Sequence, residues 1–386
     1  MAETILFVSS TGRMGGAENS LLQLAGSLDR RRFTPAVAVP EGGELARLLS
    51  SDGVRHYHLP EVRLRRSLRP GPLFGGLSRC AAAGIRTASI ALHTGASLIH
   101  SNTTTAHYVA AIAACLSGVP SIWHVRDMQA PPLLPALAER FTSAVIYCSH
   151  AVRRALPLAE MNVPRYVVHN AIHAEAFRRN ARPGLFRQEM GFEPDQPLIL
   201  MAAQMVPWKG HRALLRAMVR ISESFPRVRC CLAGGDLFGE HQGYVDELER
   251  MVDDLGLADN VLLTGYRKDI ATLMTDANLL VAPGAGEPFG RVALESMAVG
   301  TPVIAADDAG LAEVIRHGKT GLLVPPEDPA SLADAISRLL NDPELSARMG
   351  RNGRVTARKR FSLTSHVNRV QKIYTRIFHE PSVRQI

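Results

Sequence analysis

The sequence predicts an α/β protein built from two doubly wound domains. Short apolar runs of strand type alternate with amphipathic helical patterns, and this alternation starts again in the second half of the chain. The length of 386 residues also exceeds what one ordinary core supports. Because ligands of such sheets bind outside the carboxyl ends of the strands, we expect the two domains to face one cleft.

The first half is expected to contain seven strands. Each is a short run rich in β-branched or aromatic residues and bounded by turn residues. Amphipathic helices are expected between them, for example at residues 17–28 and 104–117. The predicted strands are TILFVSS, FTPAVAV, VRHYHL, SLIHS, SIWHV, SAVIYCS and RYVVHN.

The second half repeats this rhythm after a polar segment rich in Pro and Gly, residues 172–197, which predicts a linker without a strand. The chain ends in a helical pattern with a break near Phe361 and Ser362. We expect domains at 1–175 and 176–360, and a last segment, 361–386, that crosses back onto the first domain. The predicted strands are PLILMAA, VRCCLAGG, NVLLTGY, NLLVAPG, TPVIAAD and TGLLVPP.

Composition narrows the class of protein. A net charge of +8 favours an anionic partner: a phosphorylated metabolite, a lipid headgroup or nucleic acid. Five cysteines without a C-x-x-C pair indicate buried reduced thiols and no zinc site. TILFVSS is too short for the core of a signal peptide, and YVAAIAACLSGVP is too short to span a bilayer. A cytoplasmic location follows as the expectation.

Two loops that precede helices suggest phosphate contacts. Gly15 and Gly16 precede a helix, where backbone N–H groups and the helix dipole attract anions, although a plain tight turn explains them equally well. Lys209 and Gly210 follow a strand and begin a helix, a combination suited to a diphosphate. A solvated loop lysine is the alternative for Lys209.

His124 ends the predicted strand SIWHV and is followed by Arg126 and Asp127. This position predicts a side chain at the edge of the cleft, with its orientation or protonation set by the two charged neighbours. A structural histidine is the alternative interpretation.

The segment GEPFGRVALE places Glu287 in a loop before a helix and Glu295 on that helix. Phe289 and Gly290 are expected to begin the helix and to leave their N–H groups available to an anion. The two carboxylates would then hold hydroxyl groups on either side of a bound phosphate. Stabilisation of the helix dipole explains Glu287 alone, at about 0.3–1 kcal/mol, but does not explain Glu295.

EPFGRVALESMAVGTPVI, GLAEVI and GKTGLLVPPEDPASLADAI together resemble the C-terminal signature of family 4, the retaining glycosyltransferases with the GT-B fold. Glu287 and Glu295 match the E-x7-E motif of that family. MGGAENSLLQLA, HVRD, SHAVRRAL, VPWKGH and NVLLTGYRKDIATLM match in family order, so the resemblance covers nearly the whole chain. It implies two Rossmann-like domains that face a cleft.

The resemblance also implies roles for single residues. Glu295 would bind the ribose, Glu287 the hydroxyls of the transferred sugar, and Lys209 the diphosphate. His124 would lie near the anomeric carbon, which makes His124, Lys209 and Glu287 the expected catalytic residues. The implied donor-binding residues are Gly15, Gly16, Gln204, Lys209, Gly265, Tyr266, Arg267, Glu287, Pro288, Phe289, Gly290, Arg291 and Glu295, and Arg126, Asp127 and Asn102 are assigned to the acceptor side.

The implied reaction moves a sugar from a nucleotide sugar, UDP- or GDP-linked, to a sugar or lipid-linked acceptor, without a cofactor. No D-x-D motif occurs, so we expect metal-independent front-face chemistry in which Lys209, arginines and helix N-termini stabilise the leaving phosphate. A double displacement through a carboxylate stays open. An epimerase and a phosphorylase fit the ordered motifs less well.

Two departures from the family pattern are present. Gln204 stands where the family commonly has an arginine, and NAIH replaces N-G-[IV]-D. Gln204 keeps a second class of function open, a catalytically impaired homologue that acts as a binding or scaffold subunit.

The stretch 62–80 carries Arg63, Arg65, Arg66 and Arg69 among leucines. It is either a solvated loop or a docking site for an anionic membrane at the inner face, which would bring a lipid-linked acceptor to the cleft. Nucleic-acid binding is not supported, because no aromatic stacking pattern accompanies these arginines.

Overall fold

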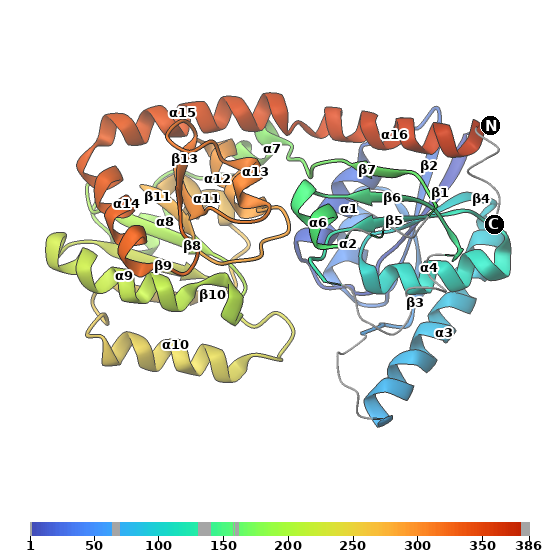
Figure 1. Ribbon diagram of the computed structural model, residues 1–386, viewed down its shortest axis with the longest axis horizontal. Coiled ribbons are helices and arrows are strands. Elements are labelled where there is room, and N and C mark those ends of the chain that lie inside the picture. The colour runs from blue at the N-terminus through green and yellow to red at the C-terminus, as the bar shows by residue number, and fades with distance from the viewer. Residues whose placement is uncertain (1, 64–69, 130–139, 157, 159–161, 380–386) are drawn as a thin grey trace. The chain divides into compact units, whose positions relative to one another are not determined.

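The computed structural model describes residues 2–63, 70–129, 140–156, 158 and 162–379. The chain divides into two compact units, Met1–Asn170 with Leu363–Ile386, and Ala171–Ser362. Each unit has its own parallel sheet with helices packed on it, as Figure 1 shows. The predicted α/β class with two parallel sheets is confirmed.

Unit 1 contains a sheet of seven parallel strands in the order β3-β2-β1-β4-β5-β6-β7. Each strand predicted in the first half is present. The strands are β1 Glu3–Val8, β2 Phe33–Pro40, β3 Arg55–Leu59, β4 Ala96–Ser101, β5 Ser121–Val125, β6 Thr142–Tyr147 and β7 Arg165–Val167. The helices are α1 Gly16–Gly26, α2 Glu44–Ser51, α3 Pro70–Thr94, α4 Thr104–Ser117, α6 His150–Ala155 and α16 Leu363–His379.

Both faces of this sheet are buried, as the period of two in a strand requires. Ile5 and Phe7 of β1 join a core with α1, α2 and α16, whereas Leu6 and Val8 join a second core with α3 and α4. Helix α16 presents one apolar face to the first core, with Val367, Val370, Ile373, Tyr374 and Ile377. The last helix of the chain is therefore part of unit 1.

The interpretation of residues 62–80 as a loop is corrected for its described part, because α3 begins at Pro70. Proline is compatible with the first helical position, and the helix packs closely on α4: a side chain at Gly84 would meet Ile112 at 2.5 Å. Arg65, Arg66 and Arg69 lie outside the described residues.

Unit 2 contains six parallel strands in the order β10-β9-β8-β11-β12-β13, and each strand predicted in the second half is present. The strands are β8 Leu198–Ala202, β9 Arg229–Ala233, β10 Val261–Gly265, β11 Leu279–Ala282, β12 Val303–Ala306 and β13 Gly321–Val324. The helices are α7 Ala174–Arg179, α8 Leu185–Met190, the 3-10 turn η1 Pro207–Lys209, α9 His211–Ser224, α10 Gln242–Asp254, α11 Ile270–Asp276, α12 Arg291–Val299, α13 Leu311–Val314, α14 Pro329–Asn341 and α15 Pro343–Arg360.

The segment predicted as a linker, 172–197, instead folds as part of unit 2. It forms α7 and α8, and Phe186 of α8 is fully buried. The Asp276 carboxylate accepts the backbone N–H groups of Phe186 and Arg187, which compensates the orphan donors of the first turn of α8. The unit begins at Ala171 rather than at the expected 176, because the Ile172 N–H donates to the Phe361 carbonyl at 3.0 Å.

Two further expectations concern the cysteines and the membrane. All five cysteines are free thiols; four are buried, as expected, but Cys115 is exposed. Among the described helices, none combines the length and the apolar character needed to cross a bilayer.

Candidate functional site

The strand order of each unit reverses at one point, and that point is where doubly wound sheets bind ligands. In unit 2 it lies between β8 and β11. The loops after these two strands touch backbone to backbone: a side chain at Gly284 would lie 2.4 Å from the Trp208 carbonyl oxygen, and one at Gly210 would lie 2.9 Å from the Gly284 nitrogen. Glycine is required at both positions, and this close approach brings Lys209 to the loop that carries Glu287.

Lys209 and Glu287 form an ion pair, with 2.5 Å between Nζ and Oε2. The other carboxylate oxygen of Glu287 accepts the Gly290 N–H at 3.3 Å. The ammonium group also lies 3.9 Å from the centre of the Trp208 ring, a cation–π geometry. About a fifth of each charged side chain is exposed, 20% for Lys209 and 18% for Glu287, so the pair is accessible but largely desolvated.

Helix α12 begins at Arg291, with Gly290 as its N-cap in a left-handed conformation. The expectation that Phe289 and Gly290 begin the helix with available N–H groups is therefore wrong. The Gly290 N–H is bound by Glu287, and Phe289 is buried with its ring 5.8 Å from that of Phe361. The N–H groups that a helix leaves without an intrahelical partner belong instead to the residues that follow Gly290.

Glu295 lies one turn into α12 and pairs with Arg291 at 2.9 Å. Burial raises the pKa of the Glu295 carboxyl, although the Arg291 charge and hydrogen bond oppose this. Since Glu295 gains nothing from the helix dipole at this depth, its cost of burial is offset mainly by Arg291. A ligand that offers hydroxyl groups would supply further donors to this carboxylate.

A pocket at this edge of the sheet unites part of the predicted set. Lys209 and Glu287 both line it, together with Trp208 and apolar strand ends, whereas Arg291 and Glu295 of α12 are not among its lining residues. The lining residues are Met201, Ala202, Ala203, Trp208, Lys209, Val281, Ala282, Gly284, Glu287, Val292 and Leu311.

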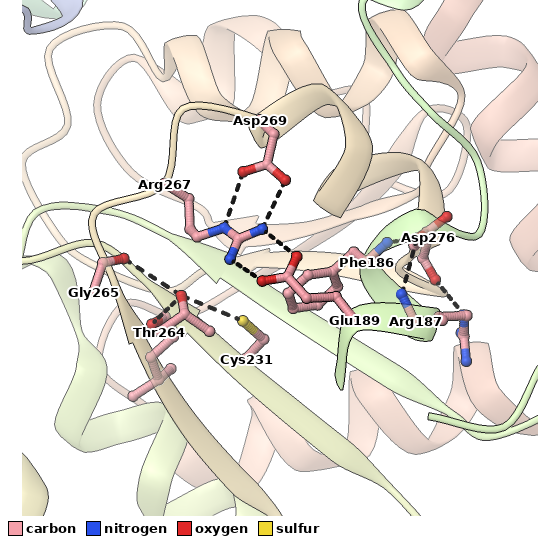
Figure 2. A network of polar contacts seen from close by, with 10 residues as sticks. Phe186, Arg187, Glu189, Cys231, Thr264, Gly265, Arg267, Asp269 and Asp276 are labelled. Carbon is pink, nitrogen blue, oxygen red and sulfur yellow. Dashed lines mark hydrogen bonds and ion pairs between the residues drawn. The ribbon is translucent and has the colours of Figure 1, made fainter. Parts of the chain in front are cut away.

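The segment Gly265 to Arg267, assigned to a base pocket, divides into two kinds of residue. The Arg267 guanidinium is held by Glu189 at 2.7 Å and by Asp269 at 2.8 Å, as Figure 2 shows. These hydrogen bonds raise the pKa of Arg267 and lower the pKa of the Glu189 carboxyl, so the arginine anchors the loop. Tyr266, in contrast, is 56% exposed. The Arg267 guanidinium is therefore committed to its two carboxylate partners.

In unit 1 the corresponding point lies between β1 and β4, and it joins the glycine loop to the acceptor-side residues. Gly15 is the N-cap of α1, and Asn102 donates to the Ala17 carbonyl at 2.8 Å. Arg126 donates to Asn102 at 3.1 Å and also to Asn170. The Arg126 guanidinium is thus fixed by two side chains, Asn102 after β4 and Asn170 after β7.

Asp127 has a structural use. Its carboxylate accepts both the backbone N–H of Thr104, at 3.1 Å, and the Thr104 hydroxyl, at 2.8 Å. Thr104 is the first residue of α4, so Asp127 stabilises that helix start. This contact is a complete explanation of Asp127 without a ligand.

Glu18 was not predicted, yet it lies beside this cluster. It is buried in the first turn of α1, and burial raises its pKa to about 7 against the opposing effects of backbone N–H groups and Arg126. The sequence signal was present in GGAEN, an acid two residues after a pair of glycines. A carboxyl that titrates near neutral pH next to a glycine loop is a candidate for a functional group.

His124 is fully buried, on the sheet face that α16 covers, rather than exposed at the strand end. Its Nδ1 lies 3.3 Å from Arg126 Nη2, and its ring stacks on that of His366 with centroids 6.3 Å apart. Burial and, second, the Arg126 charge hold the pKa of His124 well below its ordinary value. Its Nε2 has no hydrogen-bond partner among the described residues. His124 is therefore a neutral imidazole with one unused polar atom.

Comparison with known families agrees with this arrangement. The profile described as Glycosyl transferases group 1 matches residues 185–356, and the profile described as Glycosyltransferase Family 4 matches residues 14–176. The chain belongs to the family 4 glycosyltransferases. The match at 185–356 lies within unit 2, and the match at 14–176 lies almost entirely within unit 1. Each unit therefore carries one half of the family signature.

Curated members of the family match the chain over part of their length. D-inositol 3-phosphate glycosyltransferase of Streptomyces avermitilis is 34% identical over 190 residues, which are 48% of this chain and 41% of that protein. An uncharacterized glycosyltransferase of Methanocaldococcus jannaschii is 35% identical over 159 residues, 41% of this chain and 39% of that protein. The matched part is thus less than half of these relatives.

Solved structures match over nearly the whole chain. HepE of Anabaena, solved in complex with UDP and glucose, has 28% identity and a TM-score of 0.80, with 96% of this chain and 99% of that chain covered. A glycosyltransferase of Rickettsia africae reaches a TM-score of 0.81 at 20% identity, over 98% of this chain and 99% of that chain. The expected GT-B fold is thereby confirmed.

Proposed function

We propose that this protein is a retaining glycosyltransferase that moves a sugar from a UDP-linked donor to an acceptor hydroxyl. The observation that carries the proposal is the arrangement of Lys209, Glu287, Arg291 and Glu295 around the start of α12. UDP is preferred over GDP because HepE, the relative solved with UDP and with UDP-glucose, is similar over 96% of the chain.

The donor would lie along the pocket of unit 2. Lys209 carries a positive charge suited to a diphosphate, and the N-terminus of α12 adds a partial positive charge. Glu295 would accept the ribose hydroxyls, and Glu287 the hydroxyls of the sugar. Because Lys209 is paired with Glu287, the two groups are held within one hydrogen bond of each other.

Departure of the nucleoside diphosphate is the step that these charges favour. As the bond between the sugar and the phosphate oxygen breaks, negative charge grows on that oxygen. The positive charges of Lys209 and Arg291 stabilise this negative charge. The acceptor hydroxyl then attacks from the same face and transfers its proton to the departing phosphate. Glu287 is a poor nucleophile for a double displacement, because one oxygen is bound by Lys209 and the other by the Gly290 N–H.

The acceptor side belongs to unit 1. Arg126 and Asn102 offer fixed donors, and Asp127 is committed to α4. The acceptor is a sugar or a lipid-linked glycan in this proposal. Peripheral contact with an anionic membrane would involve the stretch 62–80. Of Arg63, Arg65, Arg66 and Arg69, only Arg63 lies among the described residues, 3.5 Å from Glu61. Farther along, α3 exposes Ile85 and Leu92 beside Arg86, which is compatible with such a surface.

A panel of UDP, GDP, ADP and CMP tests the donor site through thermal unfolding. A ligand at about 100 times its Kd stabilises the folded state by about 2.7 kcal/mol, which raises Tm by several degrees. We expect UDP to give the largest shift. A larger shift with GDP would mean that the donor carries guanine rather than uracil, at the same site. No shift with any nucleotide would contradict the donor site itself.

Turnover separates the enzyme from an impaired homologue. Incubation with UDP-sugars, followed by measurement of released UDP, should show donor consumption above the uncatalysed rate. UDP binding without any consumption, with or without candidate acceptors, would favour the binding or scaffold subunit that Gln204 keeps open.

A further inference from the structure

Three buried side chains from distant parts of unit 1 form a hydrogen-bonded chain. Tyr374 of α16 places its hydroxyl 2.6 Å from His100 Nδ1, and His100 Nε2 lies 3.1 Å from His124 Nδ1. All three side chains are completely shielded from solvent. The sequence separation between His100 and Tyr374 is 274 residues, so only the return of α16 onto the first sheet creates this contact.

Arg126 fixes the direction of this chain. A guanidinium has only hydrogen-bond donors, and Arg126 Nη2 lies 3.3 Å from His124 Nδ1. That nitrogen must therefore carry a lone pair, since a proton there would face the N–H of a cation. The low pKa of the buried His124 keeps the imidazole neutral, so its single ring proton resides on Nε2.

The other two members follow from this assignment. Because His124 Nδ1 is an acceptor, His100 must donate through Nε2–H, and its own Nδ1 is then unprotonated. Tyr374 must in turn donate its hydroxyl proton to that nitrogen. Each proton in the chain thus points from α16 toward His124.

The chain ends on an unsatisfied donor. His124 Nε2 is buried and has no partner in the described part of the chain. An unpaired buried N–H costs about 1–3 kcal/mol, so its presence calls for an explanation. The ring is also held from the α16 side, where His366 stacks on it and fixes its own orientation through a 2.8 Å hydrogen bond to the His169 carbonyl.

We propose that Tyr374 and His100 are positioning residues that hold His124 as its Nε2–H tautomer and reserve that N–H for an oxygen of the sugar substrate. The inference rests on the proposed glycosyl transfer for the identity of that oxygen. Helix α16 accordingly supplies part of the active arrangement of unit 1, in addition to part of its core.

The tautomer is measured directly by long-range ¹H–¹⁵N NMR of the protein labelled at histidine. In the wild type, His124 should carry its proton on Nε2. Tyr374→Phe leaves His100 Nδ1 buried and unpaired, so we expect both rings to show a second tautomer or ring orientation. The matched control is Tyr166→Phe, which removes a hydroxyl from a half-buried tyrosine beside the same core and should leave the histidine signals unchanged.

Kinetics provide the functional readout, with a rescue variant. For UDP release from a UDP-sugar, Tyr374→Phe should lower kcat by about three- to tenfold, the usual effect of one hydrogen bond, while KM stays nearly constant. His100→Gln keeps an N–H donor near the position of Nε2. In that background, Tyr374→Phe should have no further effect on kcat or on the His124 tautomer.

A wild-type His124 that carries its proton on Nδ1 would overturn the proposal. So would a Tyr374→Phe variant with unchanged histidine signals and unchanged kcat. If the wild type consumes no UDP-sugar, the proposed function fails on its own account, and the NMR comparison still decides whether Tyr374 controls the tautomer.

Discussion

Glu18 gives the sharpest prediction of pH dependence in unit 1. Its pKa is raised from 4.5 to about 7 in the folded protein, chiefly by burial. Between these two values the folded state holds a proton that the unfolded state has lost, so the free energy of unfolding falls as pH rises. At 1.36 kcal/mol for each unit of pKa difference, the loss between about pH 4.5 and 7 amounts to roughly 3 kcal/mol.

Glu18→Gln should remove this dependence, because the amide cannot ionise. Relative to the variant, the wild type should lose stability between pH 5 and pH 7 and change little above pH 8. Urea unfolding at several pH values measures the difference. The chain has two tryptophans, so a Trp208→Phe background leaves Trp123, buried in unit 1, as the fluorescent reporter of that unit.

The comparison needs a matched acid. Glu44 is a half-buried glutamate in the first turn of α2, so Glu44→Gln controls for the loss of a carboxylate at a helix start in the same unit. If the wild type and Glu18→Gln lost stability in parallel from pH 5 to pH 8, the reasoning about Glu18 would be refuted.

Three further predictions concern unit 2. Lys209→Met should lower kcat for UDP release by a factor of about 10²–10³, the usual effect of losing one charge-stabilising group. The control Lys359→Met, on the exposed face of α15, should leave kcat unchanged. Steady-state kinetics of both variants measures the difference. Gly310→Ala places a Cβ 2.3 Å from the Phe289 Cα and should cost about 1–3 kcal/mol in urea unfolding, whereas Gly235→Ala meets no atom within 4 Å and should be neutral. Donor turnover should survive EDTA, because Lys209 and α12 supply the charge; loss of turnover that Mg²⁺ restores would contradict this.

The sheets could be predicted because their signal is local. A buried parallel strand needs a short apolar run between turn residues, and all thirteen runs quoted from the sequence became strands of the two sheets. The break near Phe361 was equally visible, since α15 ends at Arg360 and α16 begins at Leu363. Helix α3 was missed at its start because Pro70, Gly71 and Gly75 resemble a loop locally, whereas its contact with α4 lies far along the chain.

The candidate site was predictable where a residue type implies its own chemistry. Lys209 and Glu287 were singled out from motifs, and the structure brings them together through the close approach of Gly284 and Trp208. The sequence could not reveal which hydrogen-bond donor each of these polar side chains binds. The binding of the Gly290 N–H by Glu287 depends on loop conformation, which no spacing rule encodes.

The environment of His124 could not be predicted from the sequence either, because its partners are distant along the chain. Its partner His100 is on the neighbouring strand β4, and Tyr374 is near the end of the chain. Such contacts follow from strand order and from the return of α16. The position of His124 near a strand end predicted that Arg126 would lie close to it, but it did not predict that His124 is completely buried.

The central claim, that Lys209, Glu287 and Glu295 form one donor site with divided roles, is tested most directly by UDP affinity. Isothermal titration calorimetry of the wild type, Glu295→Ala and Glu287→Gln would measure it. The account predicts that Glu295→Ala weakens UDP by at least about tenfold, the loss of a charged hydrogen bond, while Glu287→Gln binds UDP nearly as the wild type does. Equal UDP affinity in all three proteins would contradict the assignment of this site.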